Sequence, residues 1–137
     1  MSVTFMMEGY RCDCENPFEC ASCSKLTMNL CNENAGDLLD WLGITSGLWE
    51  AEPFNAVTLA ALCRRRLWPE PRNQDPGREP MINGQRLEFR PDPNAEAVTK
   101  ARLVDCGRRP GYLNRATARL LVIAEAAIRE GRKITWG

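Results

Sequence analysis

Four cysteines fall within twelve residues near the start of this 137-residue chain, and their spacing constrains the local fold more than any other feature. The segment reads C-D-C-E-N-P-F-E-C-A-S-C, with one residue inside the first pair and two inside the second. Paired thiolates at such spacing can hold one side of a tetrahedral Zn²⁺ ion, and two pairs complete the site. The pattern predicts a zinc knuckle whose ligands are Cys12, Cys14, Cys20 and Cys23.

The whole chain has seven cysteines, an odd number that cannot pair completely. A reducing compartment disfavours disulfides, so metal binding is favoured over one or two disulfides and over plain thiols. Cys31 is a candidate replacement for one ligand, and the cysteine-rich segment therefore extends over residues 10–31. Four thiolates leave no open coordination position, which predicts a structural zinc ion rather than a catalytic one.

The chain contains no histidine, which is the commonest general base near neutral pH. A Ser-His or Cys-His nucleophile therefore cannot be assembled from it. A hydrolase that uses Asp105 or Glu125 as a base has little support, because no paired-carboxylate arrangement is visible. The sequence favours a protein that is not an enzyme.

The hydrophobic periodicity predicts one small domain over residues 1–137, of the α+β class with α/β as the alternative. Its helices are expected at 34–42, from 53–55 to 67, and at 112–130, and its strands at 3–7, 25–30, 86–90, 98–106 and 133–136, in a short mixed sheet. Asn34 is expected to cap the first helix, and Gly43 and Gly131 to end the first and last helices. Asn83-Gly84 predicts a hairpin turn.

A proline-rich segment, PEPRNQDPGREP at 69–80, contains four prolines in twelve residues and no apolar period. This composition predicts a surface loop inside the domain. No apolar run approaches the roughly 18 residues of a membrane span. The first twelve residues, MSVTFMMEGYRC, lack the basic region and the apolar region of a signal peptide. We therefore expect a cytoplasmic protein.

Opposite charges cancel over the whole chain, which has 18 basic and 18 acidic residues, but they are unevenly distributed. Residues 1–60 carry a net charge of −7 and residues 61–137 carry +7. Either the two halves neutralise each other in the fold, or the basic half faces an anionic partner. The acidic residues Asp13, Glu15 and Glu19 around the cysteines would repel phosphate, so we do not interpret the knuckle as a nucleic-acid finger.

Three arginines gather where the last helix is expected to begin, although the helix dipole is already positive there. This arrangement needs a negative group, which is either an internal carboxylate such as Asp37, Asp40 or Glu33, or an external anion. Backbone N–H groups and guanidinium groups at such a place can bind phosphate or carboxylate. The candidate ligand-binding residues are Arg108, Arg109, Gly111, Tyr112, Arg115 and Arg119, with Asn32 and Asn34 as neighbours.

Three motifs in residues 26–137 carry a resemblance to a known group of proteins. They are N-x-N-A at Asn32–Ala35, C-G-R-x-P-G-Y-L at Cys106–Leu113, and the closing G-R-K-x-x-W-G. On these motifs the chain resembles small accessory proteins encoded by bacteriophages and prophages. The resemblance implies a protein that binds host components, as an inhibitor or a sequestering factor, in the cytoplasm of the host cell.

Together these observations predict a non-enzymatic, phage-type accessory protein that binds an anionic ligand or a host protein. A nucleotide-like ligand is one specific form of this prediction. The alternative is a zinc-containing, nucleic-acid-associated regulator that uses the basic half of the chain. That alternative requires an affinity for nucleic acid that falls steeply as the salt concentration rises.

Overall fold

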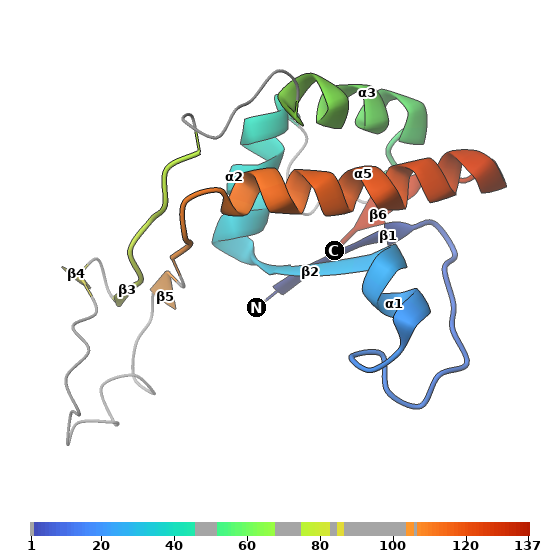
Figure 1. Ribbon diagram of the computed structural model, residues 1–137, viewed down its shortest axis with the longest axis horizontal. Coiled ribbons are helices and arrows are strands. Elements are labelled where there is room, and N and C mark those ends of the chain that lie inside the picture. The colour runs from blue at the N-terminus through green and yellow to red at the C-terminus, as the bar shows by residue number, and fades with distance from the viewer. Residues whose placement is uncertain (1, 46–51, 68–74, 83–84, 87–103, 106) are drawn as a thin grey trace.

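The computed structural model describes residues 2–45, 52–67, 75–82, 85–86, 104–105 and 107–137, which form an α+β fold as predicted (Figure 1). The main elements are β1 (Ser2–Met7), α1 (Ala21–Leu26), β2 (Thr27–Cys31), α2 (Asn32–Leu42), α3 (Ala56–Leu67), α5 (Tyr112–Glu130) and β6 (Ile134–Trp136). A second, smaller group of strands consists of β3 (Met81–Ile82), β4 (Gln85–Arg86) and β5 (Val104–Asp105).

The main sheet has the strand order β2-β1-β6. Phe5 of β1 lies opposite Met28 on one side and Trp136 on the other, and both pairings are antiparallel. The sheet is therefore antiparallel in its described strands, whereas the sequence predicts a mixed one. Alternate residues of β1, namely Val3, Phe5 and Met7, are buried. This period of two is what a strand with one covered face requires.

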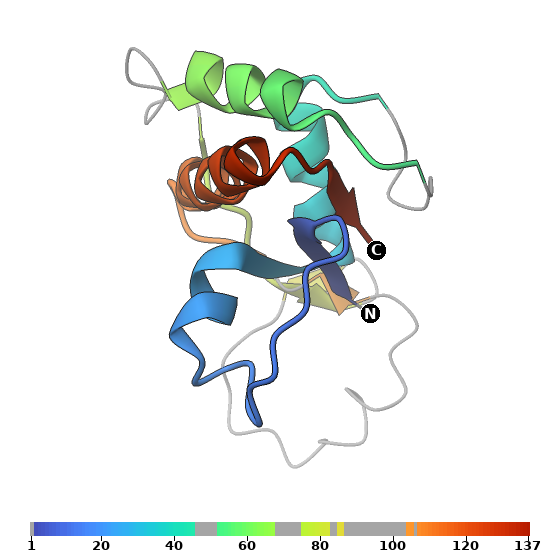
Figure 2. The ribbon, with the colours of Figure 1, turned by 90° about the vertical axis from the view of Figure 1, so that its right-hand side faces the viewer.

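The helices cover one face of this sheet. Figures 1 and 2 show α5 lying between the sheet and α3, so that α5 is the central helix of the molecule. Its buried stripe includes Leu113, Ala116, Leu120, Ile123, Ala124 and Ala127, as the helical periodicity predicts. Most of these side chains are small or unbranched at Cβ, so α3 can pack closely against α5.

Helices α3 and α5 agree with the sequence, whereas α1 and α2 differ from it. The sequence predicts no helix at α1 and expects a strand over 25–30, but Lys25 and Leu26 belong to α1 and β2 begins at Thr27. Helix α5 spans Tyr112–Glu130 as predicted, and Gly43 and Gly131 both end their helices in the left-handed conformation. Helix α2, however, begins at Asn32 with Cys31 as its N-cap, so Asn34 is not the cap. Asn34 instead lies in the first turn of the helix, and its buried side chain makes contacts outside α2.

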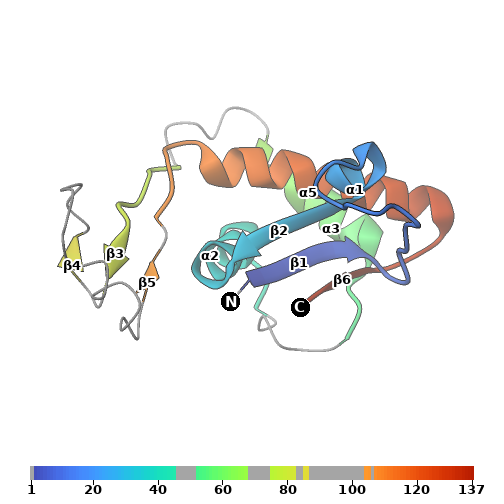
Figure 3. The ribbon, with the colours of Figure 1, turned by 90° about the horizontal axis from the view of Figure 1, so that it is seen from below.

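The small sheet has the order β4-β3-β5 and projects beyond the start of α5, as Figure 3 shows. Strands β3 and β4 pair antiparallel, as the predicted hairpin requires, and the turn residues Asn83 and Gly84 lie outside the described residues. Most of the strands predicted over 86–90 and 98–106 also lies outside them. Of the proline-rich segment the structure describes residues 75–80, and Asp75 is buried rather than at the surface.

Candidate metal centre and arginine cluster

The four cysteines predicted as ligands lie together in the structure. Their Sγ atoms are all within 4.8 Å of one another, with separations of 3.6 Å for Cys12–Cys20 and 3.5 Å for Cys14–Cys23. In a tetrahedral site with metal–sulfur bonds of about 2.3 Å, neighbouring sulfurs are about 3.8 Å apart. The cluster therefore has the spacing of a four-coordinate site and can hold a metal ion. None of the four forms a disulfide.

Helix α1 positions the second pair of thiols. Cys20 is the N-cap of this short helix and Cys23 lies in its first turn. A backbone hydrogen bond from Cys23 lowers the pKa of the Cys20 thiol to about 7, because the N–H group stabilises the thiolate. The helix thus makes the Cys20 thiol ionise readily. The resulting thiolate is the form of cysteine that binds metal.

Tyr10 is a residue of this site that the sequence analysis misses. Its hydroxyl donates a hydrogen bond to the Cys23 Sγ atom at 3.5 Å, and its ring packs against the hydrophobic core. A donor of this kind orients a metal-binding sulfur from outside the ligand set. The only signal in the sequence is that Tyr10 lies two residues before Cys12. The spacing rules for metal ligands say nothing about a tyrosine at that position.

Cys31 and Cys63 have separate roles from the cluster. Cys31 is disulfide-bonded, so the alternative in which it replaces one of the four ligands is wrong. Cys63 is fully buried in the core on the apolar face of α3. Cys106 lies outside the described residues.

A separate arginine cluster, formed by Arg78 and Arg108, lies near the start of α5. Arg108 pairs there with an internal carboxylate. Asp37 of α2 accepts hydrogen bonds from the guanidinium groups of both Arg108 and Arg78. Asn34 adds to this contact, because its Nδ2 group donates to the Gly107 carbonyl at 3.1 Å and its Oδ1 accepts from Arg78 at 3.3 Å. For Arg108, the negative group is therefore an internal carboxylate, as one of the two interpretations of the sequence expects. Arg78 also belongs to this arginine cluster, although the sequence analysis does not predict it.

Two glycines allow the segments that carry these arginines to approach closely. The backbones of Arg78 and Arg108 exchange hydrogen bonds of 2.7 and 2.6 Å. A Cβ atom at Gly107 would lie 2.5 Å from the Arg78 carbonyl oxygen, and one at Gly77 would lie 2.7 Å from that of Arg108. Side chains at either position would therefore separate the two segments.

The N-terminus of α5 also has an internal carboxylate. The Asp75 Oδ2 atom accepts the backbone N–H of Asn114 at 2.9 Å, and the Asp75 carbonyl accepts that of Gly111 at 3.0 Å. Only 1% of Asp75 is exposed. This residue satisfies two free N–H groups and places a negative charge at the positive end of the helix. The negative group that the sequence requires there thus comes from the proline-rich segment.

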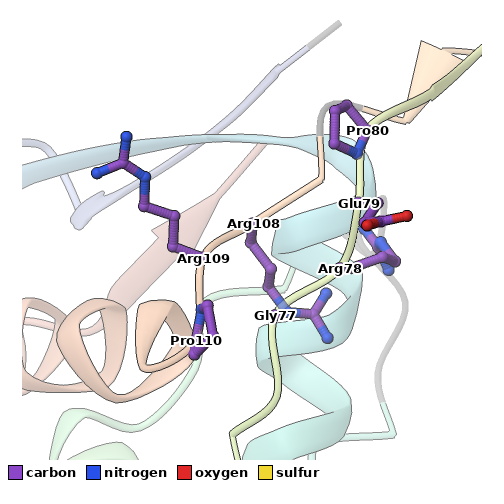
Figure 4. Close-up of a pocket in the computed structure, with 7 residues that line it drawn as sticks. All are labelled: Gly77, Arg78, Glu79, Pro80, Arg108, Arg109 and Pro110. Carbon is purple, nitrogen blue, oxygen red and sulfur yellow. The ribbon is translucent and has the colours of Figure 1, made fainter. Parts of the chain in front are cut away.

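The other predicted ligand-binding residues are more dispersed. Arg109 and Arg115 are exposed, and Figure 4 shows Arg109 pointing away from Arg108 at the edge of an open hollow of about 510 Å³. Arg119 is also exposed and donates to the Thr27 carbonyl at 3.3 Å. Tyr112 packs against the core, and the buried Asn32 Oδ1 atom has no hydrogen-bond partner among the residues that the structure describes. Gly111 precedes α5 with φ 80°, and the Arg115 guanidinium lies over it.

Many of the described arginines outside this cluster have internal partners. Arg64 forms an ion pair with Glu125 at 3.0 Å, which places Glu125 in a link between α3 and α5. The Arg66 guanidinium lies 4.8 Å from the Trp41 ring centroid, and Arg132 pairs with Glu130 at 3.4 Å. Both of these ion pairs lie within residues 61–137, so they do not join the acidic half of the chain to the basic half. The contacts of Asp37 with Arg78 and Arg108 do join the two halves.

The fold and site together define a small α+β protein with a four-thiol cluster that can bind metal. No family model matches the chain, and neither a curated protein nor a solved structure is significantly similar to it. None of the helices in the described part of the chain is long and apolar enough to span a bilayer.

Proposed function

We propose that the four-thiol cluster holds a structural Zn²⁺ ion that orders the segment between β1 and α1. The observation that carries this proposal is the mutual separation of the four Sγ atoms, all within 4.8 Å. Zinc favours four tetrahedral thiolates, and such a site has no open position for catalysis. Four thiolates at these distances would repel one another strongly, and a divalent cation compensates their charge.

Metal analysis of the purified protein tests the identity of the ion. Elemental analysis should find one zinc per chain, and Co²⁺ substitution should give the intense absorption bands of a tetrahedral tetrathiolate site. Cys14→Ser should abolish both signals, whereas Cys63→Ala should retain them because Cys63 lies in the core. Zinc that survives in Cys14→Ser, or a different metal at full occupancy, would contradict the proposal.

We propose further that the protein is a non-enzymatic, phage-type accessory protein that binds an anionic group through Arg109 and Arg115. Both side chains are exposed, whereas Arg108 is engaged with Asp37. Because Asp75 already lies at the start of α5, the open surface around Arg109 suits a carboxylate-rich face of a host protein better than an enclosed nucleotide. Arg119, one turn beyond Arg115, extends the same surface.

A comparison of two double variants tests this binding surface. Arg109→Ala/Arg115→Ala should lose a host protein that the wild type captures from lysate and that binds again as a purified component. Arg129→Ala/Lys133→Ala removes the same charge from other exposed positions and should retain it. Equal binding by both variants would exclude the Arg109 surface.

Calorimetric titrations distinguish the nature of the anion. A nucleoside triphosphate and a cyclic dinucleotide test the nucleotide form of the proposal, and either should bind only if Arg109 and Arg115 are intact. Retardation of DNA or RNA that weakens steeply with salt would instead favour the nucleic-acid regulator and overturn the protein-binding role.

A further inference from the structure

Phe18 is the most exposed of the large hydrophobic residues in the described part of the chain, with 95% of its surface accessible. It lies in the loop between the thiols of Cys14 and Cys20, which projects from the molecule below α1 in Figure 1. An aromatic side chain in this position contributes nothing to the core of its own molecule. Its burial by a partner would release a large apolar surface from water.

Local hydrogen bonds hold the Phe18 loop in one conformation. The Asn16 Oδ1 atom accepts the Phe18 N–H at 3.1 Å, and the Asn16 carbonyl accepts the N–H groups of Glu19 and Cys20 at 3.2 and 3.1 Å. With thiols of the metal site on both sides, the loop presents Phe18 as a preorganised anchor. Such an anchor loses little conformational entropy on binding.

Acidic residues surround the anchor and restrict the partner. Glu15 and Glu19 are exposed in this loop, and Asp13, which immediately precedes Cys14, is exposed as well. A matching site therefore has an apolar floor for an aromatic ring and a basic rim for the carboxylates. Nucleic acid does not fit, because its phosphates would meet these carboxylates.

Two leucines and two arginines line a pocket in the described part of the same chain. This pocket of about 250 Å³ lies between the end of α2 and the end of α3, and it is lined by Leu42, Leu62, Arg65 and Arg66. Its volume is below the roughly 300 Å³ at which ordinary small-molecule pockets begin, so it suits one side chain. Arg65 is exposed at its rim, and the Arg66 guanidinium is held over Trp41.

The Phe18 loop and this pocket lie at opposite ends of the molecule in both Figure 1 and Figure 2, so a chain cannot fill its own pocket. We infer that Phe18 of one molecule inserts into the Leu42–Leu62 pocket of a second copy, with Glu19 facing Arg65. The contact joins two different surfaces, so repeated head-to-tail contacts build assemblies larger than a dimer, as open chains or as rings where the rotation closes. A contact made by one aromatic side chain and one ion pair is small, so we expect weak association.

Sedimentation velocity of the zinc-loaded protein tests this inference, without added thiol so that the Cys31 disulfide and the metal are retained. The weight-average sedimentation coefficient should rise with concentration and pass beyond that of a dimer. Phe18→Ala should weaken association by about tenfold or more, whereas Val57→Ala, which truncates an exposed apolar residue elsewhere, should leave it unchanged. No rise with concentration, or a rise that Phe18→Ala leaves unaltered, would overturn the inference.

Charge reversal gives a second test that does not depend on the hydrophobic contact. Glu19→Lys and Arg65→Glu should each weaken self-association, because each places like charges opposite one another. An equimolar mixture of the two variants should restore it, since the introduced lysine of one variant then meets the introduced glutamate of the other. A mixture that remains monomeric would refute the contact. Arg109→Ala/Arg115→Ala should self-associate normally. Failure of the self-association inference is therefore distinguishable from failure of the proposed binding surface. Zinc content is measured on each sample.

Discussion

The carboxylate of Asp75 accepts the backbone N–H of Asn114 at 2.9 Å, and this contact ties the proline-rich segment to the first turn of α5. Asp75 therefore acts as a cap that comes from 39 residues earlier in the chain. It explains why a helix with arginines at its positive end is stable without an external anion.

Asp75→Ala should lower the free energy of unfolding by about 1–2 kcal/mol, the usual loss for a removed helix cap. Asp75→Asn keeps an acceptor but loses the charge, so it should cost less. Urea denaturation of the three proteins measures the difference. Equal stability of wild type and Asp75→Ala would show that the cap has no energetic role.

Asp37→Ala should also destabilise the protein, because it leaves the guanidinium groups of Arg78 and Arg108 without their shared carboxylate. We expect a loss of about 1–3 kcal/mol, less than for a fully buried pair, because the Asp37 side chain is 32% exposed. Asp40→Ala, on the exposed side of the same helix, should change stability by less than about 0.5 kcal/mol. Restoration of stability in Asp37→Ala/Arg108→Ala would confirm that the unpaired charge causes the loss.

Removal of the metal should unfold the cysteine-rich segment and leave the core intact. The four thiols lie outside the main cluster of buried residues, which is formed by β1, β2, α2, α3, α5 and β6. Hydrogen exchange after chelation should therefore accelerate at residues 10–26 and remain slow in α5. Acidification should release the metal in the same way, because thiolates must be deprotonated to bind it. Global loss of protection on chelation would contradict this separation.

Cys63 should resist alkylation in the folded protein. Burial raises the pKa of its thiol from 9.0 to about 12, which keeps it in the unreactive neutral form. Since the folded pKa is the higher one, the linked stability is complete below pH 9 and is lost as pH rises toward 12. Mass spectrometry after iodoacetamide treatment at pH 8 should find Cys63 unmodified until denaturant is added.

Gly107→Ala should separate the segments that carry Arg78 and Arg108. Gly107 has φ 65°, and a Cβ atom there would also lie 2.5 Å from the Pro80 nitrogen. A loss of more than about 1 kcal/mol is expected from the backbone strain alone. Gly137→Ala, where a Cβ atom meets nothing within 4 Å, is the matched control and should be neutral in thermal unfolding.

The features that sequence analysis predicts well are local ones. The spacing of the cysteines lies within one short segment, so it indicates a common centre without knowledge of the fold. Helix α5 is equally local, since its apolar period and Gly131 define its length. The need for an anion at its start also follows from the sequence, because charge and dipole both belong to the same residues.

The residues that complete these sites are distant in sequence and carry no periodic signal. Asp75 and Arg78 lie in a segment whose prolines indicate only a loop, yet both are bound to helices. Asn34 fits the rules for a cap, but a buried asparagine can equally bind a distant carbonyl, and here the Gly107 carbonyl takes its amide. Composition cannot separate these outcomes, since they depend on which segments meet in space.

The central strand β1 has a consequence for biosynthesis. Met7 pairs with Ile134, so β1 leaves the ribosome well before β6, the neighbour with which it pairs. During that interval one edge of β1 is open to pairing with other nascent chains. Yield in cells should therefore depend on elongation speed and on chaperones that shield this edge until β6 is released.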